Sequence, residues 1–481
     1  MPFVRSARDQ EILRGAQRSR GFSEIIWNVQ TGLVWPYSID CPARTRRPTW
    51  PAPVKAGELA RRTRLNSEHL RRLYCATEAD DGVVGVSAWF RQLISYTHKR
   101  SERLFENFKM AQPSALDYIT IKGFKSIASV ERLAIRPINV LIGANGSGKS
   151  NFIGVFSFLN SVREGQLQQY VRAAGGAEQL LHFGSKTTKR TEFHISFRQE
   201  INQYHLALGV TEDDSLYPIN ELVYFWDKRY ARPLWEPLPP REKGREAGIS
   251  DASVTRIPSW VRLRLGSWRL YHVHDTSSTS QMRKTAQLND NAFLRPDGSN
   301  LPAFLYLLQE KYPEFYRLIR GAVQRVAPFF DDFILRPDPL NEETIRLAWR
   351  HKNSEQYFGA SALSDGSLRF IVLATLLLQP DRFRPSVILV DEPELGLHPY
   401  AMALLASLIK QASQTSQVIV STQSSVLLDH FEPEDVLVAE RAGGGTRLTR
   451  LESPRLKAWL EDYSLGQLWE KNELGGRPDR E

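Results

Sequence analysis

The sequence predicts an α/β fold, and three observations within residues 110–481 support this prediction. Three short apolar runs have the continuous hydrophobicity of buried strands, namely PINVLIG, SVILVDE and QVIVST. Helical patterns separate them, and NFIGVFSFLNSVRE is the clearest, with its apolar residues on one face. A glycine-rich loop joins the first of these strands to this helix. Buried strands that alternate with helices are typical of the α/β class.

Local patterns in the same part of the chain predict the remaining elements. YITIKGF alternates between apolar and polar residues as a strand does, and DVLVAE with TRLTRLE predicts a closing pair of strands. Residues 191–209 predict a β-hairpin, whereas residues 227–256, rich in Pro, Arg and Glu, predict an exposed loop. Helices are expected over residues 301–326 and 400–413, and a loop that becomes a helix over residues 361–378.

Composition narrows the class of protein. The 481 residues are enough for one large domain or two to three ordinary ones. The apolar segment from Ile371 is too short to span a bilayer, and the N-terminus lacks the apolar stretch of a secretory signal. Two cysteines, Cys41 and Cys75, cannot build a disulfide scaffold. We therefore expect a cytoplasmic protein that does not contact the membrane.

The net charge of +9 is confined to the start of the chain. Residues 1–109 contain 19 Lys and Arg against 11 Asp and Glu, so they carry +8 and the rest of the chain only +1. This basic segment has no sustained hydrophobic period, with short helical patterns near 58–74 and 83–108. We expect a poorly ordered extension, with Met110 as the true start of the protein. The alternative is a basic arm that holds nucleic acid.

GANGSGKS matches the phosphate-binding pattern G-x-x-x-x-G-K-S in full, between a strand and a helix. Its members are Gly143, Ala144, Asn145, Gly146, Ser147, Gly148, Lys149 and Ser150. The glycines allow backbone N–H groups to turn toward phosphate oxygens, and the helix N-terminus adds positive potential. Lys149 is expected to reach the β- and γ-phosphates, and Ser150 to offer its hydroxyl to Mg²⁺. A glycine-rich turn without a ligand is the alternative.

The run VILVDE ends in Asp391 and Glu392. At the end of a buried strand, Asp391 is placed to hold Mg²⁺, and Glu392 to orient or deprotonate the attacking water. An acidic loop after a core strand is the alternative, and the phosphate-binding loop in the same chain disfavours it.

SALSDGSLRF, residues 361–370, places small residues at the start of a helix. It resembles the signature loop of the ABC ATPase superfamily, with Leu-Ser-Asp-Gly-Ser in place of Leu-Ser-Gly-Gly-Gln. Backbone N–H groups and Ser364 could then face a phosphate. A plain N-capped helix is the alternative.

A wider resemblance rests on motifs in a fixed order. These are ITIKGFKSI, the phosphate-binding loop with Asn151 and Phe152 after it, VRAAGGAEQLLHFGS, LSDGS, VILVDEPELGLHP and VIVSTQSSVLLDHF. Together they resemble the heads of SMC, RecF and OLD-type ATPases over most of residues 115–475, and above all small bacterial AAA-family ATPases of the RecF-like sort. The resemblance implies an ABC-type head with a sheet-based nucleotide lobe, a helical lobe, bound ATP and Mg²⁺, and a homodimer that holds ATP between its subunits.

The same resemblance implies roles for individual residues. Lys125 and Asn151 would lie near the nucleotide, and Arg172 roughly at the place of the SMC arginine finger. Residues 394–398 would form the D-loop that crosses to the partner subunit. Ser364 and Gly366 would contact the γ-phosphate held by the opposing subunit.

Two features depart from the family pattern. The switch position, often histidine, is Gln423 here. Glutamine can hydrogen-bond a phosphate or water, but it cannot change charge near neutral pH, so hydrolysis is expected to be slow or tightly gated. No clear Q-loop is present; Gln179 and Gln199 are candidates, and an ordinary surface glutamine is the favoured alternative for each.

Residues 195–355 form the part of the sequence that is hardest to interpret. His272 and His274 would face the same side of a strand, which suggests a metal site, but no further ligand is visible and polar residues near a lobe junction are the favoured alternative. Arg283, Lys284 and Arg295 suit phosphate contacts, although a solvated face is more common.

The sequence thus predicts an ATP-hydrolysing, ATP-gated dimer that acts in DNA repair or in defence against foreign DNA. Double-stranded DNA is one candidate partner. The alternative is an ATP-gated binding module that regulates an effector protein such as a nuclease or toxin, with slow hydrolysis as a timer. No heptads like those of SMC arms occur between Ser150 and Ser361, and no sequence pattern in this chain suggests the nuclease centre of OLD proteins.

The expected organisation has five parts. They are a basic extension (1–109), a nucleotide-binding lobe with the phosphate-binding loop (110–194), an insert with the helical lobe (195–355), a part with the signature, acidic pair, D-loop and switch (356–455), and a C-terminal tail (456–481).

Overall fold

The structure, a computed structural model, describes residues 25–27, 34–36 and 115–476. The chain divides into two units, Met1–Lys99 and Arg100–Glu481. In the first unit, β1 (Ile25–Trp27) and β2 (Val34–Pro36) form an antiparallel pair. The helical patterns predicted at 58–74 and 83–108, and both cysteines, lie outside the described residues. The second unit contains every candidate site residue.

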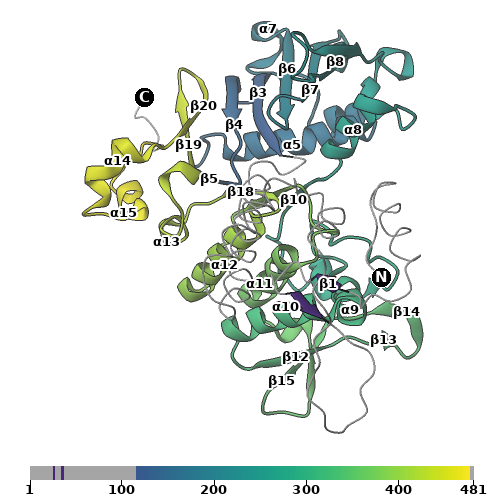
Figure 1. Cartoon of the computed structure of the whole chain (residues 1–481), viewed down its shortest axis with the longest axis vertical. Coiled ribbons are helices and arrows are strands. Elements are labelled where there is room, and N and C mark those ends of the chain that lie inside the picture. The colour runs from purple at the N-terminus through teal and green to yellow at the C-terminus, as the bar shows by residue number, and fades with distance from the viewer. Residues whose placement is uncertain (1–24, 28–33, 37–114, 477–481) are drawn as a thin grey trace, which may run out of the picture. The chain divides into compact units, whose positions relative to one another are not determined.

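A six-stranded sheet forms the centre of the second unit (Figure 1). Five parallel strands are followed by one antiparallel strand at the edge. In spatial order they are β10 (Trp268–Tyr271), β17 (Val387–Asp391), β18 (Gln417–Ser421), β5 (Ile138–Ile142), β19 (Val436–Ala442) and β20 (Gly445–Arg450). The three apolar runs are therefore confirmed as strands, and they lie side by side as β17, β18 and β5.

These strands are continuously apolar because each face of the sheet lies in a separate core. In β17, Ile388 and Val390 belong to a core with the helices on one face. Val387 and Leu389 belong to a second core on the other face. Since side chains alternate along a strand, burial of both faces requires apolar residues at every position.

Helices and two small sheets form the lobe on the first face. The helices are α9 (Leu301–Lys311), α10 (Pro313–Val326), α11 (Asp365–Leu378) and α12 (Pro399–Ala412). One sheet holds β11 (Ala286–Gln287), β14 (Asn341–Ile345) and β13 (Pro337–Asp338), and the other β12 (Phe330–Ile334), β15 (Ala348–His351) and β16 (Tyr357–Gly359). The helix predicted over 301–326 is two helices, because Tyr312 leaves the helical conformation before Pro313.

The second face packs against α5 (Lys149–Arg163) and an antiparallel sheet. Its strands, in order, are β4 (Ile127–Ala134), β3 (Leu116–Phe124), β6 (Arg190–Phe197), β7 (Asn202–Val210), β8 (Leu216–Phe225) and β9 (Leu234–Pro237). Helices α6 (Leu167–Ala173), α7 (Gly184–Thr187) and α8 (Arg256–Leu265) belong to this lobe. The hairpin predicted over 191–209 is confirmed as β6 and β7.

The exposed loop predicted over 227–256 is only partly correct. Its end, from Glu246 to Ser250, is buried. The Glu246 carboxylate accepts the Leu167 and Gln168 N–H groups at the start of α6 at 2.9 and 3.0 Å, so this end of the segment stabilises a helix N-terminus.

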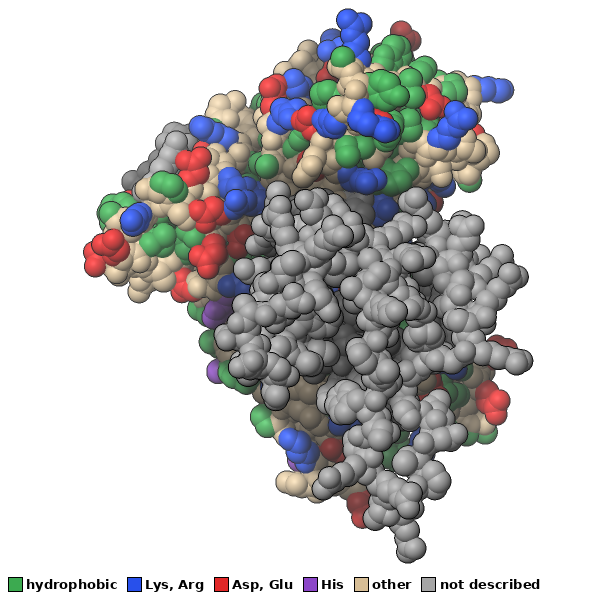
Figure 2. All heavy atoms as spheres, viewed as in Figure 1, with side chains coloured by type: hydrophobic (Ala, Val, Ile, Leu, Met, Phe, Trp, Pro, Cys, Tyr) green, Lys and Arg blue, Asp and Glu red, His purple; other side chains and the backbone are tan. Residues whose placement is uncertain are grey.

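The last part of the described chain contains α13 (Ser425–Leu428), α14 (Ser453–Leu460) and α15 (Leu465–Glu470). On the face shown in Figure 2, Asp and Glu gather over α14 and α15, whereas Lys and Arg over β6–β8 lie among hydrophobic and acidic side chains. None of the helices in the described ranges is long and apolar enough to cross a bilayer.

Candidate functional site

The phosphate-binding loop leaves the buried strand β5 and enters α5 at Lys149. Gly143, Gly146 and Gly148 all have positive φ, at 149°, 79° and 101°. Glycine is also needed at two of these positions because there is no room for a Cβ atom. A Cβ on Gly143 would lie 2.2 Å from the Ala439 carbonyl oxygen, and one on Gly148 would lie 1.9 Å from Thr446 Oγ1. The loop therefore needs glycine both for its turn and for its close approach to β19 and β20.

The Lys149 ammonium group is held at this loop. Lys149 is buried, and its Nζ donates to the Gly143 carbonyl at 2.7 Å. Burial lowers the pKa of Lys149, while the nearby Glu392, Asp391 and Glu394 carboxylates oppose that shift. The Lys149 ammonium group is therefore close enough to the carboxylates at the end of β17 to interact with them electrostatically. Asn145, Gly146 and Ser150 are exposed around the loop.

The acidic pair lies at the end of β17. Asp391 is the last residue of the strand, and Glu392 follows with φ at 41°, a left-handed conformation that is unusual for glutamate. The Glu392 N–H donates to the Ser421 carbonyl at 2.9 Å, which fixes this turn against β18. The Gln423 side-chain amide donates to Glu392 Oε1. The structure therefore pairs the predicted base with the predicted switch residue.

A buried glutamate ties the D-loop to the switch. Glu394 is 7% exposed, and its Oε1 accepts from Thr422 Oγ1 at 2.6 Å and from the Gln423 N–H at 3.0 Å. Burial raises the pKa of Glu394, and these two hydrogen bonds oppose the rise. A movement of the D-loop would therefore act directly on the residues beside Glu392.

Ser364, in the predicted signature loop, N-caps α11, and its Oγ accepts from the Ser367 N–H at 3.2 Å. A Cβ on Gly366 would lie 2.2 Å from the Gly396 carbonyl oxygen, so this glycine lets α11 approach the D-loop closely. Arg283 does not lie on a solvated face as expected. Its side chain is 8% exposed and contacts Asp365 at 2.8 Å, and it also donates to the loop backbone.

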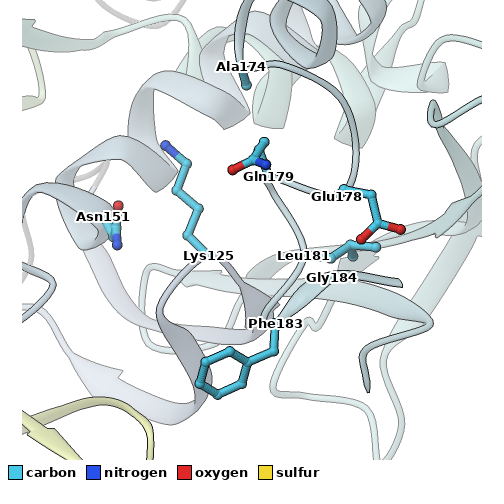
Figure 3. A pocket seen from close by; sticks show the side chains of 8 residues that line it. All are labelled: Lys125, Asn151, Ala174, Glu178, Gln179, Leu181, Phe183 and Gly184. Atoms are coloured by element: carbon cyan, nitrogen blue, oxygen red, sulfur yellow. The ribbon is translucent and has the colours of Figure 1, made fainter. Parts of the chain in front are cut away.

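A cavity of about 660 Å³ lies beside the start of α5 (Figure 3). Lys125, from the turn between β3 and β4, lies there between Asn151 and Gln179. Burial lowers the pKa of Lys125. Asn151 is two residues from Lys149 and donates to Ser126 Oγ at 2.6 Å. The cavity is large enough for a nucleoside and is lined by two of the residues expected near the nucleotide.

Gln199 and Arg172 are not among the residues that line this cavity. Gln199 occupies the β6–β7 turn, where its N–H donates to Asp117 Oδ1 at 2.9 Å, at the opposite end of β3 from Lys125. It is therefore wrong as a Q-loop residue, because it lies a full strand away from the cavity. Arg172 is exposed near the end of α6, where it acts electrostatically on Glu246, and its role as an arginine finger stays a prediction.

The structure adds two residues to the site that sequence reasoning left unassigned. The donor atoms of His272, His274 and Asp391 lie within 4.8 Å of one another. No third ligand was visible in the sequence, and Asp391 lies beside the two histidines because β10 pairs directly with β17. The signal was the H-x-H spacing after an apolar strand, but the sequence did not indicate which strand lies beside it.

The phosphate-binding loop, the acidic pair and the strand order together define a P-loop NTPase with the layout of an ABC-type ATPase head. A family model described as "AAA domain, putative AbiEii toxin, Type IV TA system" matches residues 138–429, more than half of the chain. The chain belongs to this AAA-type ATPase family.

A curated relative matches over a short segment. The Arabidopsis thaliana protein "ABC transporter G family member 37" is 32% identical over 102 residues, which is 21% of this chain and 7% of that protein. The similarity thus spans a small fraction of that relative's length.

Solved SMC heads resemble the chain over most of its length. A Smc head bound to the C-terminal winged-helix domain of ScpA is 18% identical, with 71% of this chain and 99% of that chain covered and a TM-score of 0.48. A Pyrococcus furiosus Smc head bound to the C-terminal domain of ScpA is 17% identical, with 73% and 99% covered and a TM-score of 0.44. The Thermotoga maritima SMC head domain is 14% identical, with 70% and 99% covered and a TM-score of 0.38.

Proposed function

We propose that this protein hydrolyses ATP as a homodimer, with each ATP held between the phosphate-binding loop of one subunit and the signature loop of the other. The observation that carries the proposal is the arrangement after β17. Glu392 is hydrogen-bonded to Gln423, and Gln423 is in turn held by Glu394 of the D-loop. These contacts would let the position of the D-loop act on the residue that orients the attacking water.

The residues present suit Mg²⁺. The Ser150 hydroxyl and the Asp391 carboxylate are hard oxygen ligands of the kind this ion prefers. Ser150 is exposed at the start of α5, which follows β5, and Asp391 ends β17, which lies two strands away from β5 in the sheet. Both residues therefore lie at the carboxyl ends of the parallel strands, where α/β proteins bind ligands. When bound there, the ion would neutralise phosphate charge.

The chain's own residues divide the remaining work. The Lys149 ammonium and the N–H groups at the start of α5 stabilise negative charge on the phosphates. Glu392 orients the attacking water and accepts its proton, while Gln423 holds the Glu392 carboxylate in position. Lys125 and Asn151 line the cavity proposed for the nucleoside. Ser364 and the N–H of Gly366 contribute from the second subunit.

Replacement of the base tests the proposal. Glu392→Gln should bind ATP normally, lose roughly a hundredfold or more of turnover, and accumulate as a dimer with ATP, since general-base contributions are about that size. Phosphate release and light scattering after size exclusion measure the two effects. Glu461→Gln, an exposed glutamate at the end of α14, is the matched control. Turnover by Glu392→Gln at the parental rate would refute the assignment of the base.

We further propose that turnover is coupled to DNA, in repair or in defence against foreign DNA. The charge distribution does not itself support this coupling. Residues 110–481 carry a net charge of +1. The Lys and Arg side chains visible in Figure 2 are interspersed with acidic and apolar ones rather than forming a continuous basic surface.

The second candidate is an ATP-gated module that holds or releases an effector protein, with hydrolysis as a timer. Gln423 favours it, because an amide that holds Glu392 cannot ionise, and slow hydrolysis follows. The family description names a putative toxin of a toxin–antitoxin system, which concerns the family members themselves and identifies no partner. ATP turnover with and without duplex DNA at physiological salt separates the two. Stimulation supports a DNA-coupled ATPase, and turnover indifferent to DNA supports the gated module.

A further inference from the structure

Residues 272–274 follow directly after β10, the edge strand of the central sheet. Val273 is 3% exposed and belongs to the helical-lobe core, whereas His272 and His274 are both exposed. Because side chains alternate along extended backbone, the buried valine turns both imidazoles to the opposite side. The two rings lie 6.0 Å apart between centroids.

The strand register brings a carboxylate to the same place. β10 runs parallel to β17, with Tyr271 opposite Val390. The next residue of each strand is therefore His272 on one side and Asp391 on the other. His274 Nε2 lies 3.8 Å from Asp391 Oδ2. One donor atom from each of the three residues falls within 4.8 Å of the others, without any contribution from the phosphate-binding loop.

A buried arginine fixes the backbone of this segment. Arg369, on α11, is 6% exposed. Its guanidinium donates to the Val273 carbonyl at 2.7 Å and to the His274 carbonyl at 3.2 Å, and it also donates to the Leu395 carbonyl of the D-loop. The backbone under both imidazoles is thus held by the protein interior, while the exposed rings retain the freedom to rotate toward a common point. A supported backbone of this kind preorganises a ligand set.

The three donors define the chemistry of the ligand. Two imidazole nitrogens and one carboxylate oxygen suit first-row transition metals, whereas Mg²⁺ prefers oxygen ligands alone. Metal–ligand distances near 2.0–2.2 Å place two donors of one ion roughly 3 to 3.5 Å apart. The 3.8 Å between His274 and Asp391 is close to that spacing, and rotation of the exposed His272 ring brings in the third donor.

We propose that His272, His274 and Asp391 bind one divalent transition-metal ion at the edge of the nucleotide site. Asp391 would be shared between this ion and the Mg²⁺ position on its other side. The inference deepens the proposed ATPase function, since it names a second cation at the same acidic strand end. Binding itself requires no ATP and no hydrolysis.

The test is titration of the full-length protein with Co²⁺ in the absence of nucleotide. The visible absorption of Co²⁺ reports nitrogen and oxygen ligation directly. We expect one Co²⁺ per chain, retained in a large excess of Mg²⁺. His272→Ala and His274→Ala should each weaken binding roughly tenfold or more, as should Asp391→Asn. His430→Ala is the matched control, because His430 follows α13 and belongs to no such group among the described residues.

Three results would overturn the proposal. Co²⁺ binding that is unchanged in both histidine variants would exclude the imidazoles as ligands. Co²⁺ binding that depends on Asp391 alone would show a site made of oxygen ligands only. Release of the bound Co²⁺ by excess Mg²⁺ would show the same. Because both histidines are exposed, the variants are expected to fold, and thermal unfolding checks this. ATP turnover in Mg²⁺, measured separately, tests the ATPase, so failure of one proposal is distinguishable from failure of the other.

Discussion

Single residues in this molecule derive their properties from where the fold buries them. Lys149 and Glu394 are both buried ionisable groups, and each keeps hydrogen-bond partners that offset part of the lost hydration. Glu392 is only partly buried, and it adopts a left-handed backbone conformation. Such conformations persist where the surroundings over-determine them, which here means the N–H bond to Ser421 and the Gln423 contact.

Lys149→Ala should abolish measurable ATP binding. The substitution removes the buried ammonium group that is held between the loop and the acidic pair, and loss of a charge-assisted contact costs about 1.5–3 kcal/mol for each bond. Fluorescent-nucleotide titration measures the effect. Lys457→Ala, an exposed position in α14, should bind as the parent does. Unchanged affinity in Lys149→Ala would remove the loop from the nucleotide site.

Glu221 should make stability depend on pH. It is 3% exposed and accepts from Gly248 N, Ile249 N and Tyr204 OH at 2.6, 2.9 and 2.9 Å. Burial outweighs these bonds and raises its pKa from 4.5 to about 7. A raised folded-state pKa means that its stabilising contribution is complete below the unfolded value of 4.5 and is lost as pH rises through 7.

Unfolding by urea between about pH 5 and pH 8 measures this dependence. The parent should lose up to about 3 kcal/mol across the window from this group. Glu221→Gln, which cannot ionise, should show a flatter profile, although it gives up one acceptor to the backbone. Parallel profiles for parent and variant would mean that Glu221 does not titrate in this range.

At the level of elements, two glycines set how closely α11 and the D-loop pack. Gly366 in the first turn of α11 faces Gly396, whose φ is 74°. Arg369, one turn further along α11, donates to the Leu395 carbonyl. The signature helix and the D-loop are therefore in direct contact. Glu394 of the D-loop also contacts the switch segment after β18.

Gly366→Ala should separate α11 from the D-loop. The added Cβ would meet the Gly396 carbonyl oxygen at 2.2 Å, an overlap expected to cost about 1–3 kcal/mol. Thermal unfolding and ATP turnover should both decline. Gly321→Ala, in α10, is the matched control, since a Cβ there meets nothing within 4 Å and should stabilise the helix by up to about 1 kcal/mol. Equal behaviour of the two variants would contradict the packing argument.

Local sequence patterns predicted most helices and strands, because the burial that shapes each pattern is a property of neighbouring residues. Residues 387–390 and 418–420 are continuously apolar, as expected for strands that are buried on both faces of a sheet. The prediction of an exposed loop over 227–256 was only partly correct. Its Pro and Arg content is typical of a surface, but Glu246 is buried and caps the N-terminus of α6. The solvated face expected for Arg283 could not be tested from the sequence, because its partner Asp365 lies far along the chain.

At the level of the whole molecule, the proposed active site is divided between two chains. Lys149 and Glu392 act from one subunit and Ser364 from the other in this proposal. Lys149→Ala and Ser364→Arg should each be inactive alone. In a mixed dimer, however, one of the two sites combines an intact phosphate-binding loop with an intact signature loop.

Mixing the two inactive variants in equal amounts should therefore restore about a quarter of the parental turnover, because half of randomly formed dimers are mixed and each has one intact site. Phosphate release after mixing with ATP measures it. Each variant mixed with itself is the control. No recovery, with mixed dimers demonstrated by differently tagged chains, would show that the two residues do not complete one site across subunits.

The sequence alone was sufficient for the α/β class, the phosphate-binding loop and the acidic pair, because each depends on residues that are neighbours in the chain. Tertiary structure decided which distant residues join them. Strand pairing set His272 beside Asp391, and folding of the D-loop set Glu394 against Thr422. The physical reason is that pattern reports whether a strand is buried, but not which strand hydrogen-bonds to its edge.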